Sequence, residues 1–154
     1  MPGDAVEAWE LVAREEIREL VARYAHCADG GRFDELAALF AEDGELRIDN
    51  RPAVRGRDAI RAFLGGTRDD LAASPAVRTI RHHVTSHRID VTARDAATGA
   101  CYFLVVSDRG PDHWGRYRDR YAVRDGAWRF AERRVRVDGT APGSWAAARR
   151  SAPR

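Results

Sequence analysis

The sequence predicts one α+β domain within its 154 residues. Three segments with helical periodicity come first, and four long strand-like stretches follow them in succession. Short turns join these strands, as in an antiparallel meander. A strongly curled sheet of this kind can hold helices against its concave face and leave a cavity between the two layers. We assign residues 1–138 to the domain and residues 139–154 to a flexible C-terminal tail.

The first predicted helix runs from about Ala8 to Ala28. Its apolar residues recur at spacings of three and four and share one face. Gly30-Gly31 supplies the stop signal, because glycine takes the left-handed conformation that ends a helix at little cost. Asp29 lies at the margin of the apolar face and therefore borders the core.

Two shorter helices are predicted next. One runs from about Phe33 to Phe40 and ends at a Glu42–Gly44 turn. The other opens at Gly56-Arg57-Asp58 and ends at Gly65-Gly66, and we expect a loop from Thr67 to Pro75.

Alternating residues predict a short strand over Leu46–Asp49 and then the four long strands. The long strands span Thr79–Thr92, Ala100–Ser107, Trp114–Arg124 and Ala127–Val137. The connecting turns are Ala97–Gly99, Arg109–Asp112 and Asp125-Gly126, of which the last is a strong hairpin signal.

Composition excludes several classes of function. No apolar run approaches the roughly 20 residues of a membrane span, and no secretory signal opens the chain, so we expect a cytoplasmic protein. The two cysteines, Cys27 and Cys101, lack zinc-site or disulfide spacing. All 26 basic residues are arginine, which indicates codon bias, and the formal net charge is only +2. Residues 114–154 are arginine-rich, but no nucleic-acid motif accompanies them, so we expect no nucleic-acid partner.

The segment Arg81–His87 holds three of the five histidines. Strand alternation places His82 on one face and both His83 and His87 on the other. The latter pair would lie about 13 Å apart, too far to bind one metal ion, so we expect no metal site. The alternatives for His82 are a core histidine that is bonded to a neighbour and a functional histidine.

Asp29 offers a partner for such a histidine. A carboxylate is disfavoured at the negative end of a helix dipole, so its presence there points to a role beyond capping, although a structural role is the alternative. A carboxylate in contact with an imidazole holds the ring in one orientation and makes it a usable general base.

The Trp114–Arg124 strand carries two further candidates. Tyr117 and Asp119 share the inward face and lie toward the start of the strand, where they can reach a pocket as hydrogen-bonding groups. The arginines of this strand occupy the opposite face, where we expect solvent or acidic partners.

Four motifs resemble those of one known family. They are Tyr24–Asp34, Leu39–Gly44, Arg81–Ser86, and Gly115–Asp119 together with Asp125–Arg129. Their order and spacing, over about Glu15 to Val137, resemble the SnoaL-like branch of the NTF2-like superfamily, which includes the scytalone dehydratases.

This resemblance implies a cone-shaped α+β barrel, often dimeric through the outer sheet face, with an apolar cavity open at one end. It implies that Asp29 orients His82, or His83 if the register slips by one residue. It places Tyr117 as a polar substrate contact and puts Asn50 where the dehydratases have a substrate-binding tyrosine. The second catalytic histidine of the dehydratases would fall near Val105–Ser107, where the sequence has none, so dehydration of scytalone itself is not expected.

The leading hypothesis is an enzyme without a cofactor, a lyase, isomerase or cyclase of dehydratase or polyketide-cyclase type. It would act on a small apolar or cyclic metabolite, with Asp29 and His82 as the acid/base dyad. Four residues are expected to line its cavity: Tyr24, Asn50, Tyr117 and Asp119. We also expect a homodimer. The rival hypothesis is a non-catalytic ligand-binding or assembly subunit of the same fold.

Overall fold

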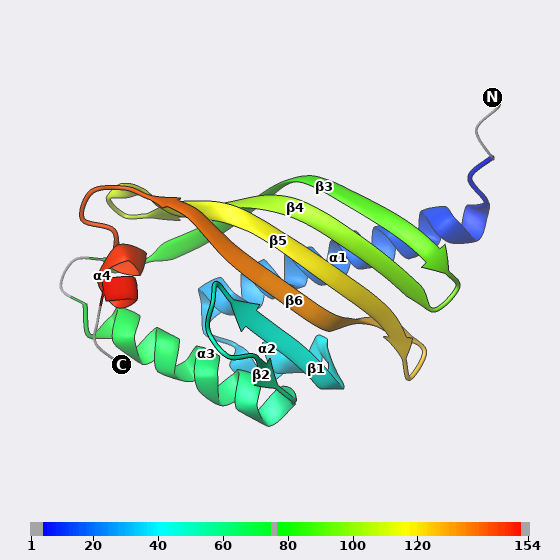
Figure 1. The fold of residues 1–154 in the computed structure, drawn as a ribbon, viewed down its shortest axis with the longest axis horizontal. Coiled ribbons are helices and arrows are strands. Elements are labelled where there is room, and N and C mark those ends of the chain that lie inside the picture. The colour runs from blue at the N-terminus through cyan, green and yellow to red at the C-terminus, as the bar shows by residue number, and fades with distance from the viewer. Residues whose placement is uncertain (1–4, 75–76, 152–154) are drawn as a thin grey trace.

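One six-stranded sheet, with the helices gathered against one of its faces, forms the α+β fold of this chain (Figure 1). The structure is a computed structural model and describes residues 5–74 and 77–151. The strand order is β2-β1-β6-β5-β4-β3, and every neighbouring pair is antiparallel except β1 with β6. The helices are α1 (Ala8–Gly30), α2 (Phe33–Ala38), α3 (Arg57–Ala72) and α4 (Trp145–Ser151). The strands are β1 (Phe40–Ile48), β2 (Val54–Arg55), β3 (Ile80–Ala93), β4 (Ala96–Ser107), β5 (Gly110–Arg124) and β6 (Ala127–Thr140). The predicted fold class is therefore confirmed.

Helix α1 ends where the glycine pair predicts. Gly31 takes the left-handed conformation at φ 69°, and the N–H groups of Gly31 and Arg32 donate to the carbonyls of Ala28 and Cys27. This cap leaves Asp29 in the last turn of α1, beside the start of β3.

Helix α3 does not stop at Gly65-Gly66, and the loop predicted from Thr67 is wrong as far as Ala72. Each glycine costs a helix about 1 kcal/mol relative to alanine. The helix continues because its last turn buries Leu71 against Val77, Trp145 and Ala146. Full burial of a leucine contributes about 1.5–3 kcal/mol. Together with the packing of Phe63 and Leu64 on the core, this offsets the helix-propensity cost of the two glycines.

The Glu42–Gly44 segment is an irregularity inside β1 rather than the predicted turn. The register between β1 and β6 shifts between Phe40 and Glu45, and a Cβ at Gly44 would lie 2.9 Å from the carbonyl oxygens of Ala41 and Phe130. Phe40, expected in the second helix, is the first residue of the strand and is fully buried.

The segment from Gly139 to Ser151 also differs from the predicted flexible tail. Strand β6 continues to Thr140, and α4 follows with Trp145 buried. Helix α4 lies beside the end of α3 at one end of the sheet (Figure 1). Residues 152–154 of the predicted tail lie outside the described part of the chain.

Candidate active site

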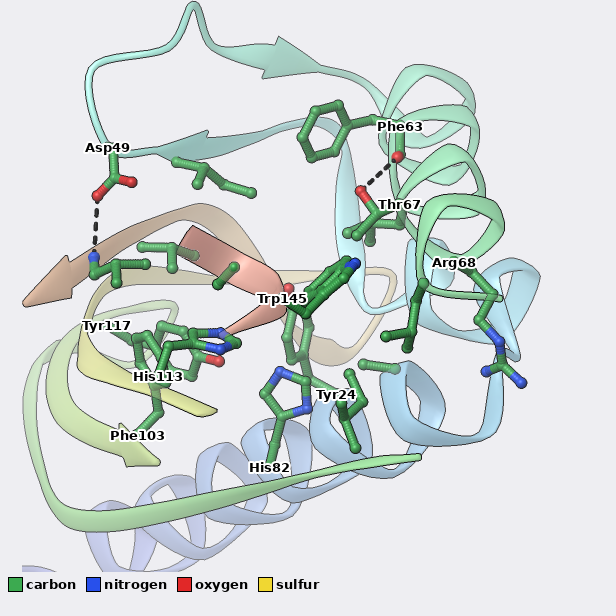
Figure 2. A pocket seen from close by; sticks show the side chains of 18 of the residues that line it. Tyr24, Asp49, Phe63, Thr67, Arg68, His82, Phe103, His113, Tyr117 and Trp145 are labelled. Carbon is green, nitrogen blue, oxygen red and sulfur yellow. Dashed lines mark hydrogen bonds between the residues drawn. The ribbon is translucent and has the colours of Figure 1, made fainter. Parts of the chain in front are cut away.

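A cavity of about 170 Å³ lies between the inner sheet face and helices α1, α3 and α4 (Figure 2). Most of its wall is apolar and includes Phe33, Ile48, Phe63, Leu64, Leu71, Ile80, Phe103, Val135, Val137 and Trp145. Its polar lining includes Tyr24, Asp49, Arg51, Thr67, Arg68, His82, His113 and Tyr117. Apolar walls with a few convergent polar groups are typical of a site for a small, largely apolar molecule.

Asp29 and His82 are in direct contact at the edge of this cavity. Asp29 Oδ1 lies 2.6 Å from His82 Nδ1, and the backbone N–H of His82 donates to Asp29 Oδ2 at 3.0 Å. The carboxylate oxygen accepts a hydrogen bond here, so Nδ1 is the donor and Nε2 is the ring nitrogen that does not face Asp29. Both side chains are largely buried, at 13% exposed for Asp29 and 16% for His82. The pair has the geometry of a general base that is held in one tautomer.

The register of β3 distinguishes the histidines. His82 lines the cavity, whereas His83 is exposed on the outer side of the strand. His87 is partly buried on the inner side, where its Nε2 lies 3.2 Å from the hydroxyl of Tyr121. The prediction that His87 shares a face with His83 is therefore wrong. The cause is a bulge at Ser86, which has φ 52°, and a register shift between Thr85 and Arg88.

Tyr24 from α1 and Tyr117 from β5 line the cavity, as predicted from the sequence. Burial is the main cause that raises the pKa of each phenol above its usual value. Both hydroxyls therefore keep their protons at neutral pH and can donate hydrogen bonds to a bound oxygen atom.

Asp119, in contrast, lies beneath the cavity and not on its surface. Its carboxylate accepts hydrogen bonds from Nε and Nη2 of the fully buried Arg133 at 3.0 and 2.8 Å, and from the Tyr121 hydroxyl at 2.9 Å. The Arg133 guanidinium stacks on the rings of Tyr24 and Tyr117 at 4.2 and 4.1 Å. The prediction that Asp119 is a cavity contact is corrected to a supporting role. Arg133 was not among the candidates from the sequence, and its guanidinium packs against the rings of both cavity tyrosines.

Asn50 also lies elsewhere than predicted. It is exposed between β1 and β2 and borders a groove on the outer sheet face, among arginines of β1, β5 and β6. Its neighbour Asp49 lines the mouth of the cavity instead, where its Oδ1 accepts the backbone N–H of Val137 at 3.0 Å. A φ of 50° at Asp49 turns the chain there.

The cavity holds a second histidine, His113, which was not predicted from the sequence. His113 is the fourth residue of β5 and is buried, and its Nδ1 lies 2.7 Å from Oδ2 of the buried Asp112. The sequence analysis assigned Asp112 to a turn and began the strand at Trp114. The strand begins earlier because the β4–β5 turn is only Asp108-Arg109, with φ 107° at Gly110. A register shift between Val105 and Val106 of β4 then places His113, and not Asp112, opposite Val105, so counting residues from the turn would not have found it.

The family follows from a match to the sequence. A model described as a SnoaL-like domain matches residues 9–134, which is most of the chain. This chain is a SnoaL-like domain. No curated protein matches it.

Solved structures similar to this SnoaL-like domain share its NTF2-like fold. A candidate scytalone dehydratase from Novosphingobium aromaticivorans has 28% identity and a TM-score of 0.75, covering 86% of this chain and 89% of its own. An NTF2-like protein with a cystatin-like fold from the same organism has 30% identity and a TM-score of 0.72, covering 90% and 95%. A protein from Catenulispora acidiphila in complex with S-DNPA has 28% identity and a TM-score of 0.71, covering 83% and 95%.

Across residues 5–74 and 77–151, no group of three or more His, Cys, Asp or Glu side chains is arranged to hold a metal ion. None of the helices in that part of the chain has the length and apolar character that a membrane crossing requires.

Proposed function

We propose that this SnoaL-like domain is an enzyme that needs no cofactor and catalyses a lyase, isomerase or cyclase reaction on a small, largely apolar, cyclic metabolite of polyketide type. The observation that carries this proposal is the 2.6 Å contact between Asp29 and His82 at the wall of an apolar cavity. The dyad supplies acid/base chemistry by itself, with His82 as the group that moves a proton and Asp29 as the group that orients it.

The chemistry that fits this lining is removal of a proton from carbon next to a carbonyl group. Nε2 of His82 takes the proton, and the electron pair of the C–H bond moves toward the carbonyl oxygen to form an enolate. Tyr24 and Tyr117 keep their hydroxyl protons and support such an oxyanion by donating hydrogen bonds. The enolate can then react in three ways. Loss of a leaving group gives a lyase reaction, return of the proton to another carbon gives an isomerisation, and attack on a second carbonyl gives a cyclisation.

The relatives support the same class of substrate. One is named as a candidate scytalone dehydratase, and another was crystallised with a small ligand, S-DNPA. The non-catalytic rival predicts a cavity that is filled by side chains and a His82 that is bonded to backbone through its ring. The observed dyad faces an open cavity of about 170 Å³, which favours the enzyme.

A panel of small cyclic ketones in D₂O, including β-hydroxy ketones and β,γ-unsaturated ketones, tests the proposal. Proton NMR reports isotope exchange, isomerisation and water loss in one measurement. We expect the wild-type protein to turn over at least one ketone. We expect Asp29→Asn and His82→Gln to lower the rate by about 10²–10⁴ fold, the usual contribution of a positioned acid or base.

His83→Gln is the matched control, because His83 is the adjacent histidine of the same strand and is exposed. It should retain the wild-type rate. The proposal fails if the wild-type protein turns over no member of the panel, or if Asp29→Asn and His82→Gln are as active as His83→Gln.

We further propose that the protein is a homodimer that pairs through the outer sheet face. Tyr102 and Trp114 are exposed on that face, on the neighbouring strands β4 and β5.

A further inference from the structure

Two Asp–His pairs, and not one, border the cavity. We infer that His113, held by Asp112, is a second acid–base residue that works opposite His82, and that the two imidazoles share one proton. This inference rests on the proposed function and deepens it, because it specifies a substrate that gives up a proton at one atom and receives one at another.

The sheet brings the two rings to the same cavity. His82 of β3 pairs with Val105 of β4, and Val105 pairs with His113 of β5, so the histidines stand in one row with a single residue between them. Val105 is fully buried and carries no polar side-chain atom. Figure 2 shows both rings projecting into the cavity from their separate strands. The ring centroids of His113 and Trp145 lie 6.4 Å apart.

Each histidine is anchored in the same way. In both rings Nδ1 faces a carboxylate, at 2.6 Å in His82 and 2.7 Å in His113. Within the described residues, the structure shows no hydrogen bond to Nε2 of either ring. Each Nε2 is therefore left to exchange a proton with a bound molecule.

Asp112 is itself rigidly held. Its carboxylate accepts hydrogen bonds from the Ser144 hydroxyl at 2.8 Å and from the backbone N–H of Trp145 at 3.0 Å, in addition to the bond from His113. These bonds more than offset the effect of burial, so the pKa of Asp112 lies below its usual value and the carboxylate is ionised. An ionised Asp112 fixes the His113 tautomer just as Asp29 fixes that of His82.

Electrostatics favours one positive charge over two on the rings of His82 and His113. The charged groups that act on His113 are Asp112, Asp49 and His82, the last from β3 across the cavity. Burial lowers the pKa of His113 despite the carboxylates, and a charged His82 lowers it further. Two imidazolium ions in one apolar cavity repel each other, so the cavity disfavours a positive charge on both rings at once.

This state suits a reaction that needs an acid and a base together. In a β-elimination, the neutral imidazole takes a proton from carbon and the C–H electron pair becomes the new double bond. The bond from carbon to the leaving oxygen breaks, and that oxygen takes the proton of the imidazolium and departs as water. The ring that acted as base now carries a proton from the substrate and the ring that acted as acid has lost its own, and proton exchange with solvent restores the starting state.

NMR titration of the histidine rings tests the shared proton without any substrate. In the wild-type protein, His113 should titrate below the usual midpoint of about 6.5. His82→Gln removes the like charge and should raise the His113 midpoint, whereas His83→Gln should leave it in place. A His113 midpoint that is the same in all three proteins, or a His113 that does not titrate while the protein is folded, overturns the inference.

Kinetics on a ketone from the panel tests the catalytic role. His113→Gln and His113→Phe should each lower kcat by about 10² fold or more and remove one limb of a bell-shaped pH profile. His113→Phe keeps an aromatic ring against Phe103 and Trp145, so it separates proton transfer from packing.

The two failures are distinguishable. If Asp29→Asn and His82→Gln lose activity while both His113 variants retain the rate and both limbs, His113 only packs and the proposed function stands. If the wild-type protein has no turnover, the proposed function falls and the catalytic role of His113 falls with it.

Discussion

Arg133 is the residue on which the floor of the cavity depends. It is fully buried and is neutralised by Asp119 through two hydrogen bonds. Asp119→Asn would leave a buried guanidinium without its counter-ion, so we expect a loss of about 3–5 kcal/mol in the free energy of unfolding. Asp138→Asn, which breaks an exposed ion pair with Arg116, should cost less than about 1 kcal/mol. Urea unfolding of both variants checks this, and equal losses would contradict it.

Single residues also mark where sequence reasoning succeeds and fails at this site. Helix periodicity and strand alternation predicted the faces of Asp29, His82 and Tyr117, because they fix the face of a side chain within a regular element. The contact between Asp29 and His82 was predicted from the family resemblance. The face of His87 could not be predicted, because the bulge at Ser86 inverts the alternation of the residues that follow it. Asp119 faces inward as expected, but its partner Arg133 follows an irregularity in β6, so their contact was not visible in the pattern.

At the scale of elements, α3 shows how tertiary packing overrides a local stop signal. Gly65 and Gly66 lie within the helix, and a Cβ added at either would meet no atom within 4 Å. Gly65→Ala and Gly66→Ala should therefore each raise the free energy of unfolding by about 0.5–1 kcal/mol, through helix propensity and a less flexible unfolded chain. Thermal or urea unfolding measures the gain.

Gly31→Ala is the contrasting substitution for the same measurement. Gly31 has φ 69°, and an added Cβ would lie 2.8 Å from the Arg68 guanidinium. We expect this variant to be less stable than the wild-type protein. The packing argument would be contradicted if Gly31→Ala raised the free energy of unfolding, or if Gly65→Ala and Gly66→Ala both lowered it.

Helices and strands as units were more predictable than their ends. All four long strands, the Asp125-Gly126 turn and the end of α1 could be predicted, because this turn and the capping glycine are local signals. The turn predicted at Ala97–Gly99 is wrong, because these residues belong to β4 and the chain turns at Arg94-Asp95. The end of α3 and the whole of α4 depend on contacts between distant segments. Trp145 packs in one cluster with Leu71 and Val77, and the first turn of α4 is held by Asp112. No local pattern in residues 139–151 contains that information.

For the whole molecule, the sheet has one face covered by helices and one face that is open (Figure 1). The open face presents Tyr102 at 60% and Trp114 at 41% exposed, with arginines such as Arg116 and Arg118 beside them. Tyrosine, tryptophan and arginine are the residues enriched at protein interfaces. Pairing through the sheet edge at β3 is disfavoured, because the Ser86 bulge interrupts that edge.

We therefore expect light scattering after gel filtration to give twice the chain mass of 17.2 kDa. The double variant Tyr102→Arg, Trp114→Arg adds charge to a face that is already basic and should give the monomer mass. Leu11→Arg, Val12→Arg is the matched control, because these α1 residues are each 57% exposed and lie away from the sheet face. A wild-type monomer, or dissociation by the α1 substitutions alone, would rule out the outer sheet face as the dimer interface.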